Sequence, residues 1–139
     1  MGSPLMRVVI DSSVALTWAF DDEATTRQAI RTLELVRDDG ALVPPLFRYE
    51  IANALVAGCL RERISRSEAA AFLGRLDELP LRVSTDAQDG PRLLAAGADH
   101  RLTAYDAAYL VLAQDTGSRL ATNDVALRKA AKRAGVALV

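Results

Sequence analysis

Apolar residues along the chain gather in five short runs, which are separated by longer stretches with helical spacing. In the longer stretches apolar side chains recur every three or four residues, as at Ile30, Leu33 and Val36, which is the period of an amphipathic helix. The short runs are typical of buried strands. The five predicted strands cover residues 8–10, 41–43, 81–83, 119–122 and 136–139.

Strands that alternate with helices predict the fold class. Parallel neighbouring strands need long crossovers, and the crossover helices then cover both faces of the sheet. Gly40, Pro80 and Gly117 stand between the predicted segments, where helix ends and turns require such residues. We therefore expect an α/β protein, a three-layer α/β/α domain with a five-stranded, mainly parallel sheet.

The length of 139 residues fits one domain. We assign residues 6–139 to this domain and interpret residues 1–5 as a leader or an expression remnant, with Met6 as the native start. No apolar run approaches the roughly 20 residues that cross a bilayer, and no signal-peptide pattern opens the chain. These features predict a cytoplasmic protein.

Composition limits the metals and partners that the protein can bind. The single cysteine, Cys59, and the single histidine, His100, cannot supply the three or four ligands that zinc prefers, so any metal must be held by oxygen. The 17 basic and 18 acidic residues leave no basic excess of the kind that marks strong nucleic-acid binding. An aromatic content of 5% argues against binding through a long row of stacked rings.

Two aspartates are expected at the carboxyl ends of strands. Asp11 ends the first predicted strand, and Asp124 follows the fourth. Ligands of open parallel sheets gather at this edge. Each residue also suits the N-cap of the helix that follows it, so capping is an alternative role for either one alone.

Glu50 falls in the apolar stripe of a predicted helix, with Asn53 beside it. Helical geometry places Glu50 on one face with Leu46, Phe47 and Ala54. An ionised carboxylate buried there costs several kcal/mol unless it finds an arginine, a cluster of donors or a cation. The alternative to a role in a functional site is that Glu50 is a structural glutamate paired with such a partner.

Asp106 lies in a helix that is apolar almost all round. Thr103, three residues earlier, resembles the N-cap of a capping box in which Asp106 would have a local role. Asp106 can belong to a capping box and to a functional site at the same time.

Two strand-end aspartates and two acids on apolar helix faces suit a hard divalent cation such as Mg²⁺ or Mn²⁺. Without a cation these carboxylates would repel one another, and at least one should take up a proton. With the four acids set aside, 14 acidic residues remain against 17 basic ones. The resulting excess of positive charge on the rest of the molecule favours a polyanionic substrate.

Four runs in this order closely resemble PIN-domain ribonucleases, above all the VapC-type toxins of prokaryotic toxin-antitoxin pairs. The resemblance extends from Met6 to the C-terminus, and the ordered set is far more specific than any single run. The runs are VIDSSV at 9–14, PLFRYEIANAL at 45–55, LTAYDAAYLVLA at 102–113 and LATNDVAL at 120–127.

The resemblance implies roles for individual residues and for partners. By it, Asp11, Glu50, Asp106 and Asp124 are the acidic metal-binding and catalytic residues, and Ser12, Thr122 and Asn123 support them. It implies Mg²⁺- or Mn²⁺-dependent endonucleolytic cleavage of RNA, a homodimer, and inhibition by a VapB-type antitoxin. Arg61, Arg63 and Arg66, near the end of the predicted Glu50 helix, could guide the RNA backbone or simply be solvated.

Two other interpretations of the sequence compete with that of a metal-dependent nuclease. Other α/β phosphate enzymes fit poorly, because no glycine-rich turn follows Asp11 and Ser13 stands where a dehalogenase-like phosphatase would carry a second aspartate. A catalytically silent binding module could keep the acids only to engage an antitoxin or RNA. A nuclease assay with the metal omitted separates this module from an enzyme.

Overall fold

The computed structural model describes residues 7–20, 27–86 and 89–139, and the predicted leader at 1–5 lies outside them. Strands and helices alternate along the chain as expected. The elements are β1 (Val8–Ile10), α1 (Ser12–Leu16), α2 (Arg27–Asp39), β2 (Ala41–Val43), α3 (Leu46–Leu60), α4 (Arg66–Asp77), β3 (Leu81–Val83), α5 (Gly90–His100), α6 (Ala104–Thr116), β4 (Arg119–Ala121) and α7 (Val125–Arg133).

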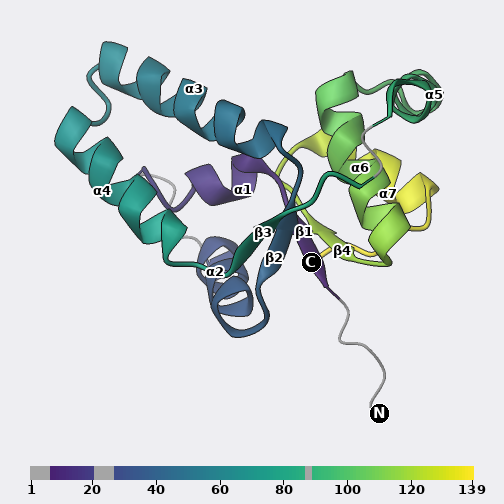
Figure 1. Ribbon diagram of the computed structural model, residues 1–139, viewed down its shortest axis with the longest axis horizontal. Coiled ribbons are helices and arrows are strands. Elements are labelled where there is room, and N and C mark those ends of the chain that lie inside the picture. Colours follow the sequence, from purple (N-terminus) through teal and green to yellow (C-terminus); the bar gives the residue numbers. More distant parts are fainter. Residues whose placement is uncertain (1–6, 21–26, 87–88) are drawn as a thin grey trace.

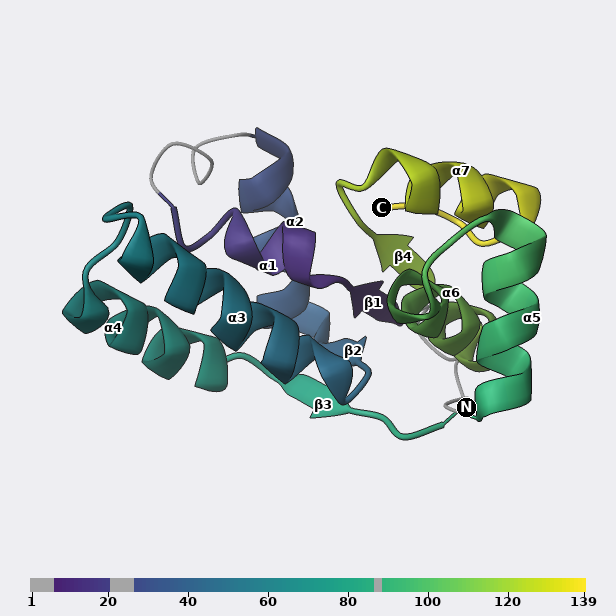
Figure 2. The ribbon, with the colours of Figure 1, turned by 90° about the horizontal axis from the view of Figure 1, so that it is seen from above.

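The sheet has the strand order β3-β2-β1-β4, and every neighbouring pair is parallel. Helices α1 to α4 lie on one side of it and α5 to α7 on the other (Figures 1 and 2). The predicted three-layer α/β class is confirmed. The predicted fifth strand, residues 136–139, follows α7 after a turn at Gly135, whose φ is +75°. It pairs with β4 only at the single bridge between Leu120 and Leu138. The sheet of the described residues therefore has four strands.

The direction of the crossovers changes between β1 and β4. The chain moves from β1 outward to β2 and β3, and then crosses back over β1 to β4 on the other edge. The loops after β1 and β4 therefore lead to opposite faces of the sheet. In open α/β sheets such a switch point creates a crevice at the carboxyl ends of the strands, which is where ligands bind.

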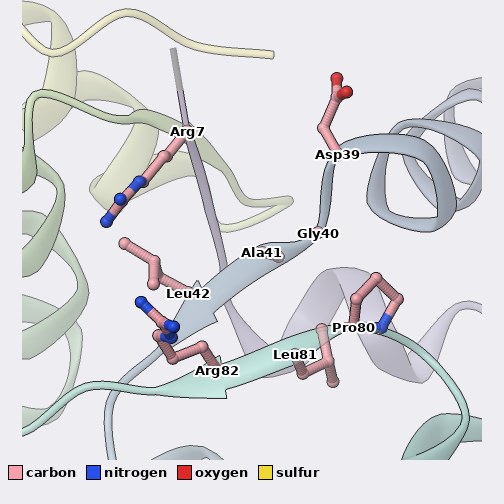
Figure 3. A pocket seen from close by; sticks show the side chains of 8 residues that line it. All are labelled: Arg7, Asp39, Gly40, Ala41, Leu42, Pro80, Leu81 and Arg82. Atoms are coloured by element: carbon pink, nitrogen blue, oxygen red, sulfur yellow. The ribbon is translucent and has the colours of Figure 1, made fainter. Parts of the chain in front are cut away.

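The amino ends of the strands carry a different feature. A pocket of about 360 Å³ opens there, lined among others by Arg7, Gly40, Pro80 and Arg82 (Figure 3). It lies at the edge of the sheet opposite the residues that follow β1 and β4. None of the predicted site residues lines it.

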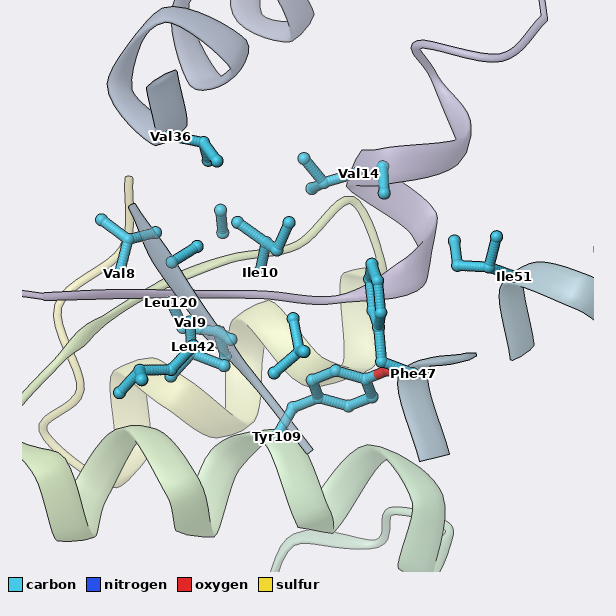
Figure 4. Packing of buried hydrophobic residues seen from close by; sticks show 14 of the residues in the cluster. Val8, Val9, Ile10, Val14, Val36, Leu42, Phe47, Ile51, Tyr109 and Leu120 are labelled. Atoms are coloured by element: carbon cyan, nitrogen blue, oxygen red, sulfur yellow. The ribbon is translucent and has the colours of Figure 1, made fainter. Parts of the chain in front are cut away.

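The core holds these elements in place. Val8, Val9 and Ile10 of β1 are buried on both faces, as a central parallel strand requires. They pack with side chains from the helices on either side, among them Val36, Phe47 and Tyr109 (Figure 4). Helix α6 is buried from Ala107 to Ala113, which explains its apolar sequence. In the described part of the chain no helix is long and apolar enough to span a membrane.

Candidate active site

Asp11 joins the ends of β1 and β4. Its backbone N–H donates to the carbonyl of Ala121 at 3.1 Å, and its side chain is 5% exposed. Oδ1 accepts from Ser13 Oγ at 2.6 Å and from the Val14 N–H at 3.1 Å, and Oδ2 accepts from the Thr122 hydroxyl. Asp11 thus caps α1, as the local pattern indicates, while a hydroxyl after β4 holds its other oxygen.

The loop after β4 is tied to the same point. Asp124 N–H donates to Thr122 Oγ1 at 3.0 Å, and Asp124 Oδ1 accepts from the Leu127 N–H at 2.8 Å, which caps α7. Asn123 N–H donates to Ser13 Oγ at 3.1 Å. The side chains of Thr122 and Ser13 therefore connect two loops that are more than a hundred residues apart in sequence.

Glu50 comes from the first turns of α3 and lies half-buried beside that helix's apolar stripe. Its Oε1 accepts from the Tyr109 hydroxyl at 2.5 Å and from Ser12 Oγ at 3.4 Å. Tyr109 belongs to α6 and is 1% exposed. A hydrogen bond from a buried phenol thus fixes the carboxylate between the two helices.

Asp106 lies in the first turn of α6, and its carboxylate has no hydrogen-bond partner among the described residues. Only half of the suggested capping box forms: the Asp106 N–H donates to Thr103 Oγ1 at 3.1 Å, but no returning bond from the Asp106 side chain is present in that part of the chain. The carboxylate is nevertheless half-buried. Its role is therefore not that of a cap.

Burial and repulsion between carboxylates disfavour ionisation of three of these acids. Burial raises the pKa of Asp11, Glu50 and Asp106 above their ordinary values, against the opposing effect of the hydrogen bonds to Asp11 and Glu50. Repulsion raises these pKa values further: Glu50 acts on Asp11, Asp106 acts on Glu50, and both Asp124 and Asp11 act on Asp106. Burial and the bond to Glu50 raise the pKa of Tyr109, which stays a proton donor.

No basic side chain in the described structure forms an ion pair with these four acids. All 17 lysines and arginines lie within the described residues. The ion pair found within those ranges joins Arg92 to Asp115, on α5 and α6, away from the acids. Converging carboxylates without a protein cation are the donor set that a hard divalent cation requires. Within the same ranges, however, no three acidic, histidine or cysteine side chains already surround one point closely enough to hold an ion.

The raised pKa values predict how stability depends on pH in the absence of metal. From the ordinary carboxyl values of 3.8 and 4.5 up to the raised folded-state values, the folded protein binds more protons than the unfolded chain. Its free energy of unfolding should therefore fall as pH rises through that window. Thermal melts with a chelator should show a shallower fall for Asp106→Asn, because the amide does not titrate.

Comparing the dependence of stability on pH in the wild type and in Asp106→Asn separates the effect of the site from that of other carboxyl groups. Glu68, whose pKa is lowered by its bonds within the capping box of Ser65, acts in the opposite direction but equally in both proteins. Identical slopes for the two proteins would contradict the repulsion among the acids.

A groove of about 380 Å³ borders the site between α1 and α3. Ser13 and Asn123, which are hydrogen-bonded at the acidic edge, lie along it together with Arg61 and Arg63. The guanidinium of Arg63 lies over the Phe20 ring, 4.4 Å from its centre. Arg66 begins α4 and does not line the groove. Of the three arginines singled out in the sequence, two therefore line the groove that extends to the site.

Two residues of the site were missed in the sequence. Ser13, not Ser12, donates to Asp11, because the first turn of α1 directs the second hydroxyl toward the cap. Tyr109 holds Glu50. Its signal was its position three residues after Asp106 on one helix, which places both on one face.

Comparisons with known proteins agree with this geometry. The model of the PIN domain family matches residues 8–133. The chain is 32% identical over 121 residues to Ribonuclease VapC3 of Pyrobaculum aerophilum, covering 86% of this chain and 90% of that protein. The crystal structure of PAE2754 from Pyrobaculum aerophilum superposes with a TM-score of 0.72 and 21% identity, over 93% of this chain and 87% of that one.

Proposed function

Since the chain belongs to the PIN-domain family, we propose that it is a metal-dependent endoribonuclease and the toxin of a type II, VapBC-like toxin-antitoxin system. The observation that supports the proposal is a group of four carboxylates that are near enough to repel one another and have no basic partner in the described structure. The carboxylate of one of them, Asp106, also has no hydrogen bond there. The ribonuclease name of a relative with 32% identity supports RNA as the substrate.

Asp11, Asp106 and Asp124 would hold Mg²⁺ or Mn²⁺, with Glu50 as a further ligand or as the group that orients the attacking water. Such a cation supplies activation of water and stabilisation of charge on the phosphodiester. Ser13 and Thr122 hold the two oxygens of Asp11 in a fixed orientation. Tyr109 and Ser12 do the same for one oxygen of Glu50 and leave its other oxygen available.

The direct test is cleavage of end-labelled RNA with Mg²⁺, with Mn²⁺ and with a chelator. The proposal expects cleavage that requires the cation and stops when the cation is removed. Binding of RNA without cleavage under all three conditions would instead identify a catalytically silent binding module.

The partners follow from the same family. We propose a homodimer in the cytoplasm and a VapB-type antitoxin whose segment crosses the acidic edge and brings an arginine to the unpaired carboxylates. A guanidinium suits this role because it pairs with carboxylates through two parallel hydrogen bonds. A co-purified inhibitor that bound far from Asp11 would contradict this mode of inhibition.

Tyr109→Phe should reduce cleavage by about tenfold to a hundredfold, the usual effect of removing a residue that orients a ligand. The phenylalanine keeps the buried ring in place but removes the donor to Glu50 at 2.5 Å, so the pKa of Glu50 should rise further. The activity of the variant should therefore rise to its plateau at higher pH than that of the wild type. A pH profile of cleavage measures this shift, and an unchanged profile would remove Tyr109 from the mechanism.

Replacing Arg61 and Arg63 together by alanine should weaken RNA binding and flatten its salt dependence. For single-stranded RNA, the slope of log affinity against log salt becomes shallower by about 0.7 for every phosphate that the protein no longer neutralises. Arg66→Ala is the matched control, because Arg66 lies outside the groove that the other two line. Titrations at several salt concentrations measure the slopes. Equal slopes for wild type and the double variant would mean that the two arginines do not neutralise RNA phosphates.

A further inference from the structure

The pocket at the amino ends of the strands has no part in the candidate active site. Its volume of about 360 Å³ falls in the range of small-molecule sites, roughly 300 to 1,000 Å³. Apolar residues, among them Leu42, Pro80 and Leu81, form much of its wall, and Arg7 and Arg82 add two guanidinium groups (Figure 3). An apolar wall with a few polar groups is typical of a site for a small ligand.

Close packing of two chain segments fixes the wall of this pocket. Gly40 has a φ of +77°, and a Cβ added to it would lie 2.9 Å from the carbonyl oxygen of Pro80. The Ala41 N–H donates to the same oxygen at 3.1 Å. Strands β2 and β3 therefore begin side by side, with no room for a side chain at position 40. This packing holds the strand that carries Arg82 in place beside β2.

The register of the sheet places both arginines on one face. Leu42 of β2 pairs with Val9 of β1 on one side and with Arg82 of β3 on the other, and side chains in register point the same way. Arg7 lies two residues before Val9, where the side-chain direction repeats, and its carbonyl still accepts from the Arg119 N–H at 2.8 Å. The two guanidinium groups accordingly lie on the same side of the pocket, with the Leu42 side chain between them (Figure 3).

Neither guanidinium group has a hydrogen bond or an ion pair with any described residue. Asp39 also lines the pocket, but at the end away from the two arginines (Figure 3). Two positive charges on one face attract an anion that can lie between them. The planar fork of a guanidinium matches the oxygens of a phosphate group, to which it can donate two parallel hydrogen bonds.

We propose that Arg7 and Arg82 form a binding site for the phosphate group of a small ligand, either a phosphate ester or inorganic phosphate. The phosphate oxygens would accept hydrogen bonds from both guanidinium groups, and the remainder of an ester would lie against the apolar wall. The site is at the opposite edge of the sheet from the residues that follow β1 and β4, so it is separate from the acids. It needs no metal ion and does not rest on the proposed function.

The test locates the bound ligand on the protein. The full-length chain, labelled with ¹⁵N, is titrated with AMP, inorganic phosphate and adenosine at constant ionic strength in a chelator, and the amide NMR signals are followed. AMP should shift the signals of residues 40–42 and 81–82 and leave those of Asp11 and Asp124 unchanged. Adenosine, which has no phosphate, should shift none of them. Tighter binding of AMP than of inorganic phosphate would assign the site to phosphate esters, and equal binding would assign it to inorganic phosphate.

Arg7→Gln and Arg82→Gln should each weaken binding of AMP and of inorganic phosphate about tenfold, the effect of losing a hydrogen bond between charged groups. Both arginines are exposed, so the variants should keep the fold. Arg31→Gln is the matched control, because Arg31 is an exposed arginine of α2 that does not line the pocket. It changes the net charge by the same amount and should bind like the wild type.

Several outcomes would overturn the inference. These are no shift of the pocket signals with either phosphate compound, shifts centred on Asp11 and Asp124, wild-type affinity in both glutamine variants, or an equal loss of affinity in Arg31→Gln. Binding of adenosine as tight as that of AMP would also contradict it. The titrations contain neither RNA nor metal, so a protein that binds phosphate in this pocket but cleaves no RNA would lose the proposed function and keep this inference.

Discussion

Asp11→Asn, Asp106→Asn and Asp124→Asn are each expected to lose metal-dependent RNA cleavage, by more than the roughly hundredfold that removal of a supporting residue can cost. Asparagine keeps the size of aspartate and can still cap a helix, so the ends of α1 and α7 should stay intact. What the change removes is an anionic oxygen ligand. Glu50→Gln should lose cleavage to a similar or slightly smaller extent.

Initial rates of cleavage at saturating Mn²⁺ measure this effect. Asp99→Asn is a suitable control, because Asp99 is an exposed acid near the end of α5 and lies outside the group of acids. The control should cleave like the wild type. Wild-type rates in two of the four site variants would remove these residues from the catalytic centre.

The second large effect is expected in stability. Without metal, Asp106→Asn should melt at the same temperature as the wild type or higher, since the substitution relieves repulsion from Asp124 and Asp11 and removes no hydrogen bond of the carboxylate. Asp106→Ala should behave in the same way, because the Asp106 side chain caps nothing. A residue that served as a cap would instead cost about 0.5 to 2 kcal/mol on replacement by alanine.

With Mn²⁺ present, the wild type should instead melt at a higher temperature than the Asp106 variants. A ligand at a hundredfold excess over its dissociation constant stabilises the folded state by about 2.7 kcal/mol, which is roughly 5 to 10 °C for a domain of this size. The wild type should gain this shift, and the Asp11, Glu50, Asp106 and Asp124 variants should gain much less. Melting curves with a chelator and with Mn²⁺ give both numbers. Equal shifts in all five proteins would show that the acids do not form one metal site.

The sequence was most informative where one residue has a conspicuous local setting. Asp11 and Asp124 stand at the ends of apolar runs, and Glu50 and Asp106 interrupt apolar helix faces, so each was recognisable without coordinates. The parallel sheet followed from the alternation of strands and helices. Placing Asp11 and Asp124 at one edge then needed only the rule that parallel strands end together.

What could not be predicted depends on contacts between distant segments. Whether Ser12 or Ser13 faces Asp11 is decided by the first turn of α1, and Tyr109 reads as an ordinary core residue until α6 packs against α3. The capping box at Thr103 looked complete, but a side chain at the third position can turn either toward the helix start or away from it. The 136–139 run has a strand's composition, yet its pairing stops at one bridge.

The place of β4 beside β1 also determines when the acids can come together during synthesis. Asp11 leaves the ribosome early, but Thr122, which binds its carboxylate, and Asp124 are translated more than a hundred residues later. Domains generally fold as units, and a partly translated chain has Asp11 and Glu50 but neither β4 nor the loop after it. The four acids can therefore come together only when nearly the whole domain has been made.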